Sequence, residues 1–207
     1  MPYILGLTGN IASGKTTVGL MLLELGATTY VDADLVVHEL YLPGSSLVPR
    51  LVEVFGSQIL DAAGGVDRRV LGERVFGDPE QLQRLEAIVH PAVQNALVGR
   101  LRALPPEGIG VLDAVKLVES GYAPFCHGIW LVTAPHEVQL HRLIESRGLT
   151  PEEARLRLAA QPPLEAKREV ATEIIDNSGA LDDLRAQVTA AWGRFLASIG
   201  AGEGARG

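Results

Sequence analysis

The segment that most constrains the fold is a glycine-bearing turn at residues 9–16, which reads Gly-Asn-Ile-Ala-Ser-Gly-Lys-Thr. An unbroken apolar run precedes it at residues 3–7, and apolar residues at helical spacing follow it over residues 16–25, before Gly26. The apolar run is typical of a strand buried on both faces. The helical spacing is typical of an amphipathic helix. Strand, turn and helix together match G-x-x-x-x-G-K-[ST], a loop that wraps its backbone N–H groups around phosphate.

The side chains of this loop suit a nucleotide. Lys15 would reach the β and γ phosphates, and the hydroxyl of Thr16 would ligate Mg²⁺. The alternative, a plain glycine turn with a solvated lysine, is disfavoured by the strand and helix on either side. The residues of the motif, predicted to bind the phosphates, are Gly9, Asn10, Ile11, Ala12, Ser13, Gly14, Lys15 and Thr16.

The same strand and helix patterns recur along the chain. Short strands are predicted at residues 28–31, 109–113, 129–133 and 173–175, with helical stretches between them. Five strands alternating with helices predict an α/β fold, with a parallel sheet and helices on both of its faces. The long second connection has helical spacing at residues 47–55, 69–76 and 79–104. We therefore expect one domain whose core is residues 1–34, 105–134 and 169–199, with a helical insertion at about 35–104.

A second, smaller insertion is predicted at about residues 135–168, with helices at 135–147 and 150–160. The second helix begins with Thr150, Pro151 and Glu153, the pattern of a capping box. Over residues 142–168 six Lys or Arg face four acids, which alone is typical of a solvated helix face. Residues 200–207 lack core residues and caps, so we expect a disordered tail.

Composition excludes several classes of protein. The 207 residues, 47% apolar and 21% charged, suit a folded globular chain, and a net charge of −7 argues against a nucleic-acid partner. The apolar runs are too short to span a membrane, and the first residues do not form a signal peptide. The single cysteine, Cys126, has no partner for an internal disulfide and is expected to be a small buried hydrophobe. We expect a cytoplasmic protein with no membrane partner.

Acidic residues follow the second and third predicted strands. In open parallel sheets the carboxyl ends of strands face the ligand, so Asp32 and Asp34 are candidates for a catalytic base or a metal organiser. Capping the next helix is an alternative for one of them. Asp113 after the third strand is equally a Mg²⁺ ligand through water or a helix cap.

Two further residues have alternatives of equal standing. His90 precedes Pro91 within the first insertion, and it is as much a structural cap as a contact to substrate. Asn177 lies after the fifth strand in the sequence Asp-Asn-Ser-Gly, which is typical of an Asx turn. The same position, at the carboxyl end of a strand, would also let the loop line an adenine pocket.

Taken together, the chain resembles the dephospho-CoA kinases along nearly its whole length. The loop at 9–16 is common to many kinases, whereas the ordered Asp-Ala-Asp at 32–34, His-Pro at 90–91 and Asp-Asn-Ser-Gly at 176–179 make the resemblance specific. Residues 68–69, 113–119 and 157–161 add to it. The resemblance implies a P-loop kinase that uses ATP with Mg²⁺ to phosphorylate the ribose 3′-hydroxyl of dephospho-CoA, the last step of coenzyme A synthesis.

The resemblance also implies roles for single residues. Asp34 becomes the base that faces the 3′-hydroxyl, with Asp32 in support. The insertion at 35–104 becomes the CoA-binding part, and residues 135–168 become a lid whose arginines (Arg142, Arg147 and Arg157) supply positive charge to the phosphates. The resemblance further implies that Ala12 to Thr17 bind ATP, and Arg142 is expected both to bind ATP and to act in catalysis.

The chain departs from the family pattern Asp-x-Pro-Leu-Leu-Phe/Tyr-Glu after the third strand. Asp113, Leu117 and Glu119 match it, but Val115 replaces the proline and Lys116 the first leucine. We expect Lys116 to meet a phosphate of dephospho-CoA or to pair with Asp34 or Asp113; the alternative is a surface lysine. The rival functions are a kinase for nucleosides or nucleotides and a non-enzymatic nucleotide switch.

Overall fold

The computed structural model describes residues 2–204, which form two compact units. The first unit extends to Tyr30 and resumes at Leu104, and the second covers residues 31–103. The second unit thus covers nearly the same residues as the predicted insertion. That it binds CoA stays a prediction.

The first unit is built on the predicted parallel sheet. Its strands are β1 (Tyr3–Thr8), β2 (Thr29–Asp32), β3 (Ile109–Asp113), β4 (Gly128–Thr133) and β5 (Glu173–Asp176). They lie in the order β2-β3-β1-β4-β5, and β1 is paired in parallel with both β3 and β4. The α/β prediction is confirmed. Because β1 is the central strand, the loop that follows it emerges in the middle of one edge of the sheet.

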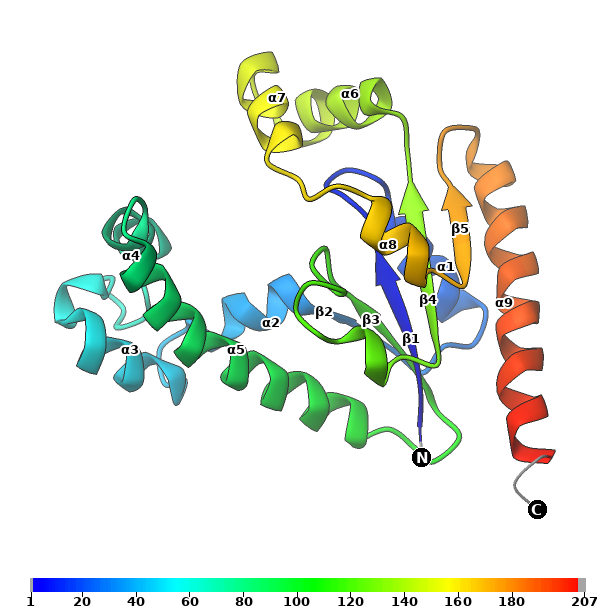
Figure 1. Cartoon of the computed structure of the whole chain (residues 1–207), viewed down its shortest axis with the longest axis horizontal. Helices are drawn as coiled ribbons and strands as arrows, with labels where there is room; N and C mark the ends of the chain where they lie inside the picture. The colour runs from blue at the N-terminus through cyan, green and yellow to red at the C-terminus, as the bar shows by residue number, and fades with distance from the viewer. Residues whose placement is uncertain (1, 205–207) are drawn as a thin grey trace. The chain divides into compact units, whose positions relative to one another are not determined.

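Helices cover this sheet and extend from its carboxyl edge. They are α1 (Lys15–Glu24), α6 (His136–Arg147), α7 (Pro151–Ala159), α8 (Glu165–Val170) and α9 (Leu181–Gly204), with a short turn η2 (Ala123–Phe125) before β4. In Figure 1, α8 lies in front of the sheet and α1 behind it, while α9 runs beside β5. One core joins α1 and α9 to the strands, with the fully buried Trp130 and Leu7 among its members.

A second core belongs to the α6–α7 hairpin. Leu143, Ala154 and Leu158 are buried together, and the loop residues Ile11 and Ala12 pack against them. The predicted capping box of α7 is present, with Thr150 Oγ1 accepting from the Glu153 N–H and Glu153 accepting from the Thr150 N–H. The α6–α7 hairpin is therefore packed directly against two apolar residues of the phosphate loop.

The second unit is helical, with α2 (Ala33–Leu40), α3 (Leu47–Phe55), η1 (Ser57–Ile59), α4 (Arg68–Val75) and α5 (Pro79–Arg102). Helix α5 continues through Pro91, so the idea that His90 caps a helix start is wrong. The cap of α5 is Asp78, whose side chain accepts from the N–H groups of Glu80 and Gln81. His90 lies in the middle of α5, and its side chain is exposed.

Two further details concern the first unit. Helix α9 extends to Gly204, so residues 200–204 are helical where a disordered tail was predicted, and residues 205–207 lie outside the described residues. Cys126 packs close to Gly6 of β1, and burial raises the pKa of its thiol to about 12. None of the helices within residues 2–204 is long and apolar enough to cross a membrane.

Candidate active site

The turn between β1 and α1 has the backbone of a phosphate loop. Gly9, Ala12 and Gly14 have positive φ angles of 147°, 58° and 99°. A Cβ atom on Gly9 would lie 2.3 Å from the carbonyl oxygen of Val132, and one on Gly14 would lie 2.0 Å from Asn177 Nδ2. Both glycines are therefore favoured by their close neighbours as well as by their φ angles.

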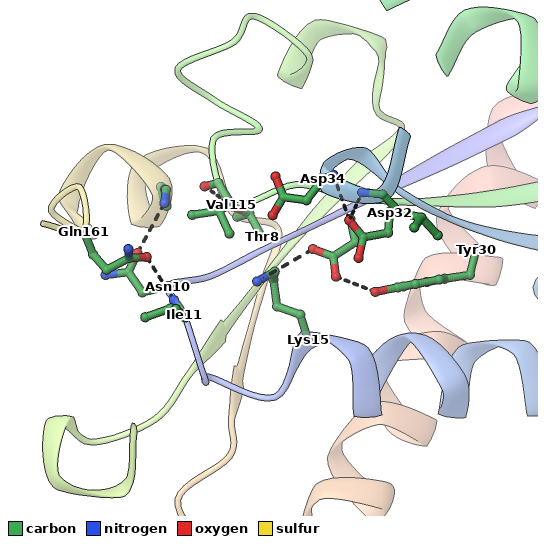
Figure 2. A network of polar contacts seen from close by, with 12 residues as sticks. Thr8, Asn10, Ile11, Lys15, Tyr30, Asp32, Asp34, Val115 and Gln161 are labelled. Carbon is green, nitrogen blue, oxygen red and sulfur yellow. Dashed lines mark hydrogen bonds and ion pairs between the residues drawn. The ribbon is translucent and has the colours of Figure 1, made fainter. Parts of the chain in front are cut away.

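Lys15 lies at the start of α1 beside the carboxylate that ends β3. Its Nζ is 3.8 Å from Asp113 Oδ1, and the hydroxyl of Tyr30 donates to Asp113 Oδ2 at 2.5 Å (Figure 2). Asp113 is buried and is followed by turns rather than a helix, so the alternative that it caps a helix is wrong. The buried carboxylate is balanced by the lysine that would bind phosphate.

Tyr30 was missed by the sequence reasoning, because its role depends on a contact between strands. A Cβ atom on Gly19 of α1 would lie only 2.1 Å from the Tyr30 ring, so the ring occupies the space that this glycine leaves open. That position brings the phenol to Asp113.

Arg142 of α6 is also hydrogen-bonded to the loop. Its guanidinium donates to the carbonyl oxygens of Ala12 at 3.2 Å, Ser13 at 3.3 Å and Asn177 at 3.1 Å. Asn177 Nδ2 in turn donates to Ser13 O at 2.8 Å. Arg142 was expected to act on phosphate, but its hydrogen bonds in this structure are to backbone carbonyls.

The segment before α8 supplies contacts that the sequence reasoning did not find. Gln161 Oε1 accepts from the Ile11 N–H at 3.0 Å, as Figure 2 shows, and Asn10 Nδ2 donates to Pro162 O at 3.2 Å. Lys167 of α8 donates to Asn10 Oδ1 at 3.3 Å. Its side chain is fully buried, a property that local sequence does not reveal.

A cavity of about 470 Å³ opens beside the loop. It is lined by predicted site residues (Ala12, Gly14, Lys15, Thr16, Thr17, Arg142, Arg147 and Asn177) together with Ser146, Gly179, Leu181 and Leu184. The volume is in the range of small-molecule sites. A lining that combines the phosphate loop, a lysine and two arginines with two leucines suits a molecule with a polyphosphate and a flat apolar base.

The loop at 176–179 has the predicted Asx turn. The N–H and hydroxyl of Ser178 both donate to the Asp176 carboxylate, at 3.1 and 2.9 Å. Asn177 is buried between the loop and Arg142, and Gly179 lines the cavity. Turn chemistry and cavity lining are therefore both present.

The acids at 32 and 34 have distinct surroundings within the second unit. Asp32 Oδ1 accepts from the N–H groups of Asp34 at 2.8 Å and Leu35 at 3.2 Å, so Asp32 is the N-cap of α2. Asp34 is exposed, and its carboxylate forms no hydrogen bond or ion pair with any described residue. Of the two, Asp34 is the one available to a substrate.

Two other predicted residues lie apart from these contacts. Lys116 is exposed and forms no ion pair within residues 2–204, so its predicted pairing with Asp34 or Asp113 is not found. Arg157 is exposed on α7 and does not line the cavity, although its carbonyl accepts from Gln161 Nε2 at 3.3 Å.

The residues present fit a magnesium ion that arrives with a nucleotide. Thr16 lines the cavity next to Lys15, and its hydroxyl is exposed at the first turn of α1. No group of three or more His, Cys, Asp or Glu side chains gathers into a metal site anywhere in residues 2–204. Mg²⁺ needs no such cage, because it is usually held by one or two protein oxygens, phosphate oxygens and water.

Comparison with known proteins agrees with this geometry. The family model described as dephospho-CoA kinase matches residues 3–183. A dephospho-CoA kinase of Symbiobacterium thermophilum is 47% identical over 191 residues, which cover 91% of this chain and 80% of the relative. One of Geobacter metallireducens is 42% identical and covers 91% of this chain and 94% of the relative. A crystal structure from Thermus thermophilus superimposes with a TM-score of 0.77 at 36% identity, and covers 93% of this chain and 97% of that one.

Proposed function

The chain belongs to the dephospho-CoA kinase family, and we propose that its phosphate loop binds ATP and transfers the γ-phosphoryl group to the ribose 3′-hydroxyl of dephospho-CoA. The products are coenzyme A and ADP, so this is the last step of coenzyme A synthesis. The observation that carries the proposal is the strained loop with Lys15 beside a buried carboxylate, next to a cavity lined by arginines. Because coenzyme A synthesis is a reaction of central metabolism, we also propose that it takes place in the cytoplasm.

Lys15 and the loop amides bind and orient the phosphates in this proposal. The ammonium of Lys15 lies against Asp113 and is free to turn toward the β and γ phosphates while Asp113 keeps its hydrogen bond from Tyr30. When bound, Mg²⁺ would neutralise charge on the same phosphates, held by the Thr16 hydroxyl and, through water, by Asp113. These contacts thus support a site in which Lys15 pairs either with the Asp113 carboxylate or with a phosphate.

Asp34 is the proposed general base. It would accept the proton of the 3′-hydroxyl as the ribose oxygen bonds to the γ phosphorus and the bond to the ADP oxygen breaks. Its exposed carboxylate has no competing partner among the described residues, and it follows the carboxyl end of a strand, where ligands of open parallel sheets bind. Asp32, engaged as the cap of α2, would hold this part of the backbone in place.

The remaining roles concern substrate binding. We assign dephospho-CoA to the helical insertion at about 35–104, with contacts from His90 and, after β3, from Lys116. Residues 135–168 are assigned as the lid, in which Arg142 and Arg147 line the ATP cavity and Arg157 would meet substrate on closure. The apolar contact of Ile11 and Ala12 with the α6–α7 hairpin supports this, since it links the lid directly to the phosphate loop.

The decisive experiment is ADP release measured with and without dephospho-CoA. The proposal expects turnover that depends on dephospho-CoA and is lost in Lys15→Ala, because that lysine neutralises the charge in transfer. Adenosine and nucleoside monophosphates serve as competing acceptors. ADP release that ignores every acceptor would indicate a nucleotide switch, and preference for a nucleoside would indicate a different kinase.

A further inference from the structure

Lys167 is a buried charge that the proposed reaction does not use. It lies on α8, and its side chain has 0% relative exposure. The ammonium lies 3.5 Å from Glu119 Oε1, in the turn after β3, and 3.3 Å from Asn10 Oδ1, in the phosphate loop. A charge without solvent must be paired, and these two oxygens are its partners.

The bond to Asn10 fixes the direction of that side chain. An ammonium only donates hydrogen bonds, so it must face the oxygen of the Asn10 amide. The NH₂ group of Asn10 then points to the opposite side, where it donates to Pro162 O at 3.2 Å. Together with the bond from Ile11 N–H to Gln161, the segment 161–167 holds two successive residues of the loop.

These hydrogen bonds hold the two residues that precede a strained position of the loop. Ala12 follows directly, and it is the one residue other than glycine within 2–204 with positive φ. Such a conformation persists only where the surroundings enforce it. Burial lowers the pKa of Lys167, and the nearby charge of Lys15 lowers it further, while Glu119 opposes both. The two ammonium groups therefore lie close enough to influence one another across the loop.

We propose that Lys167 is a positioning residue of the nucleotide site, which orients Asn10 and, with Glu119 as its counter-ion, holds the loop backbone in its phosphate-binding shape. The inference rests on the proposed function only in taking this loop as the ATP site. It also gives Glu119 a reason to be present, as the partner that allows a charge to be buried beneath the loop.

The test is the affinity for ATP of Lys167→Met, measured by calorimetric titration, together with the KM values for both substrates. The Kd and KM for ATP should rise roughly tenfold or more, as expected for the loss of one hydrogen bond to a charged group. The KM for dephospho-CoA should stay within about twofold, because its site is not held by this contact. Arg168→Met is the matched control: it removes the same charge from the next, exposed residue and should leave both KM values unchanged.

Asn10→Ala guards against a variant that does not fold, since it removes the contact from the loop side and leaves Lys167 paired with Glu119. It should raise the Kd for ATP in the same direction, and the double variant should be no worse than the more severe single one. Additive effects, or a lower melting temperature with an unchanged Kd for ATP, would reduce Lys167 to a packing role. Because titration needs no acceptor, the result stands even if the assigned reaction fails in the ADP assay.

Discussion

The two carboxylates after β2 have different tasks because their oxygens have different partners. One carboxylate oxygen of Asp32 accepts hydrogen bonds from two backbone N–H groups at the start of α2. Asp34, two residues later, keeps both oxygens free of any described partner. The residue types alone left the roles open, since either aspartate could cap the helix. The hydrogen bonds separate them.

Asp34→Asn should therefore lower kcat by about 10²- to 10⁴-fold with little change in the Kd for ATP, because the amide cannot accept the proton. Asp32→Asn is the matched control. Asparagine caps helices as well as aspartate does, so this variant should remain close to wild type. Steady-state rates and ATP titration of both variants check the prediction. A larger loss of kcat in Asp32→Asn would move the base to the other carboxylate.

Arg142 is hydrogen-bonded to backbone carbonyls of the phosphate loop and of Asn177, and its replacement should therefore disturb the loop itself. One guanidinium spans three carbonyls, which the compact ammonium of lysine cannot do. Arg142→Lys should thus raise the KM for ATP and lower kcat together, by roughly tenfold in kcat/KM, the factor that about 1.4 kcal/mol represents. Arg155→Lys, on the exposed face of α7, is the control. A fall in kcat alone would mean that Arg142 acts only in the transition state.

Sequence predicted the loop residues well and their supports poorly. Gly9, Lys15 and Thr16 belong to one local pattern whose spacing follows directly from phosphate binding. Tyr30, Gln161 and Lys167 act through contacts with residues more than eighty positions away. Such contacts depend on the order of the strands and on which side chains are buried. Neither property can be predicted from local sequence patterns.

The strands and most helices were predicted within a few residues, whereas two short helices, α2 and α8, were not predicted. The bounds of α3 were predicted as found, and the capping box located the start of α7. Helix α8 has six residues, too few for a periodic pattern, and α2 begins directly after β2 with no turn residues between them. Pro91 lies inside α5, although proline is usually found at the start of a helix.

One ion pair ties α9 to the edge strand β5 and should be sensitive to acid. Arg194 donates to both oxygens of Glu173, at 2.6 and 3.0 Å, and this hydrogen bonding lowers the pKa of Glu173 below its ordinary 4.5. A lowered carboxyl pKa stabilises the fold above the unfolded value, and that contribution disappears as the pH falls through the folded pKa.

Arg194→Met should accordingly lower the melting temperature at pH 7, and the difference from wild type should shrink by pH 3. Glu173→Gln should remove the same pH-dependent part. Thermal unfolding followed by circular dichroism across this range checks both variants. An equal difference at both pH values would show that Arg194 contributes through its packing alone.

The two compact units of the chain fit a reaction with two substrates. The lengths of the connections between the predicted strands already indicated where one unit ends and the other begins. The long stretch between β2 and β3 predicted an insertion, and the structure has a compact helical unit over 31–103. That unit buries apolar side chains, Val36, Leu51, Phe55 and Leu97 among them. A separate compact unit can respond to its own ligand.

Amide hydrogen exchange should therefore resolve the two binding events. A non-hydrolysable ATP analogue alone should slow exchange in residues 9–17, in the segment 161–167 and around Asn177, because the side chains of Gln161 and Asn177 are hydrogen-bonded to the loop backbone. Dephospho-CoA alone should slow exchange mainly within 31–103, since the helical insertion is its assigned site. The Lys15→Ala variant should lose the first response and keep the second, which makes it the control for each ligand. If dephospho-CoA instead protected only the residues that the ATP analogue protects, the insertion would not be its binding site, and the assignment of 35–104 would have to be withdrawn.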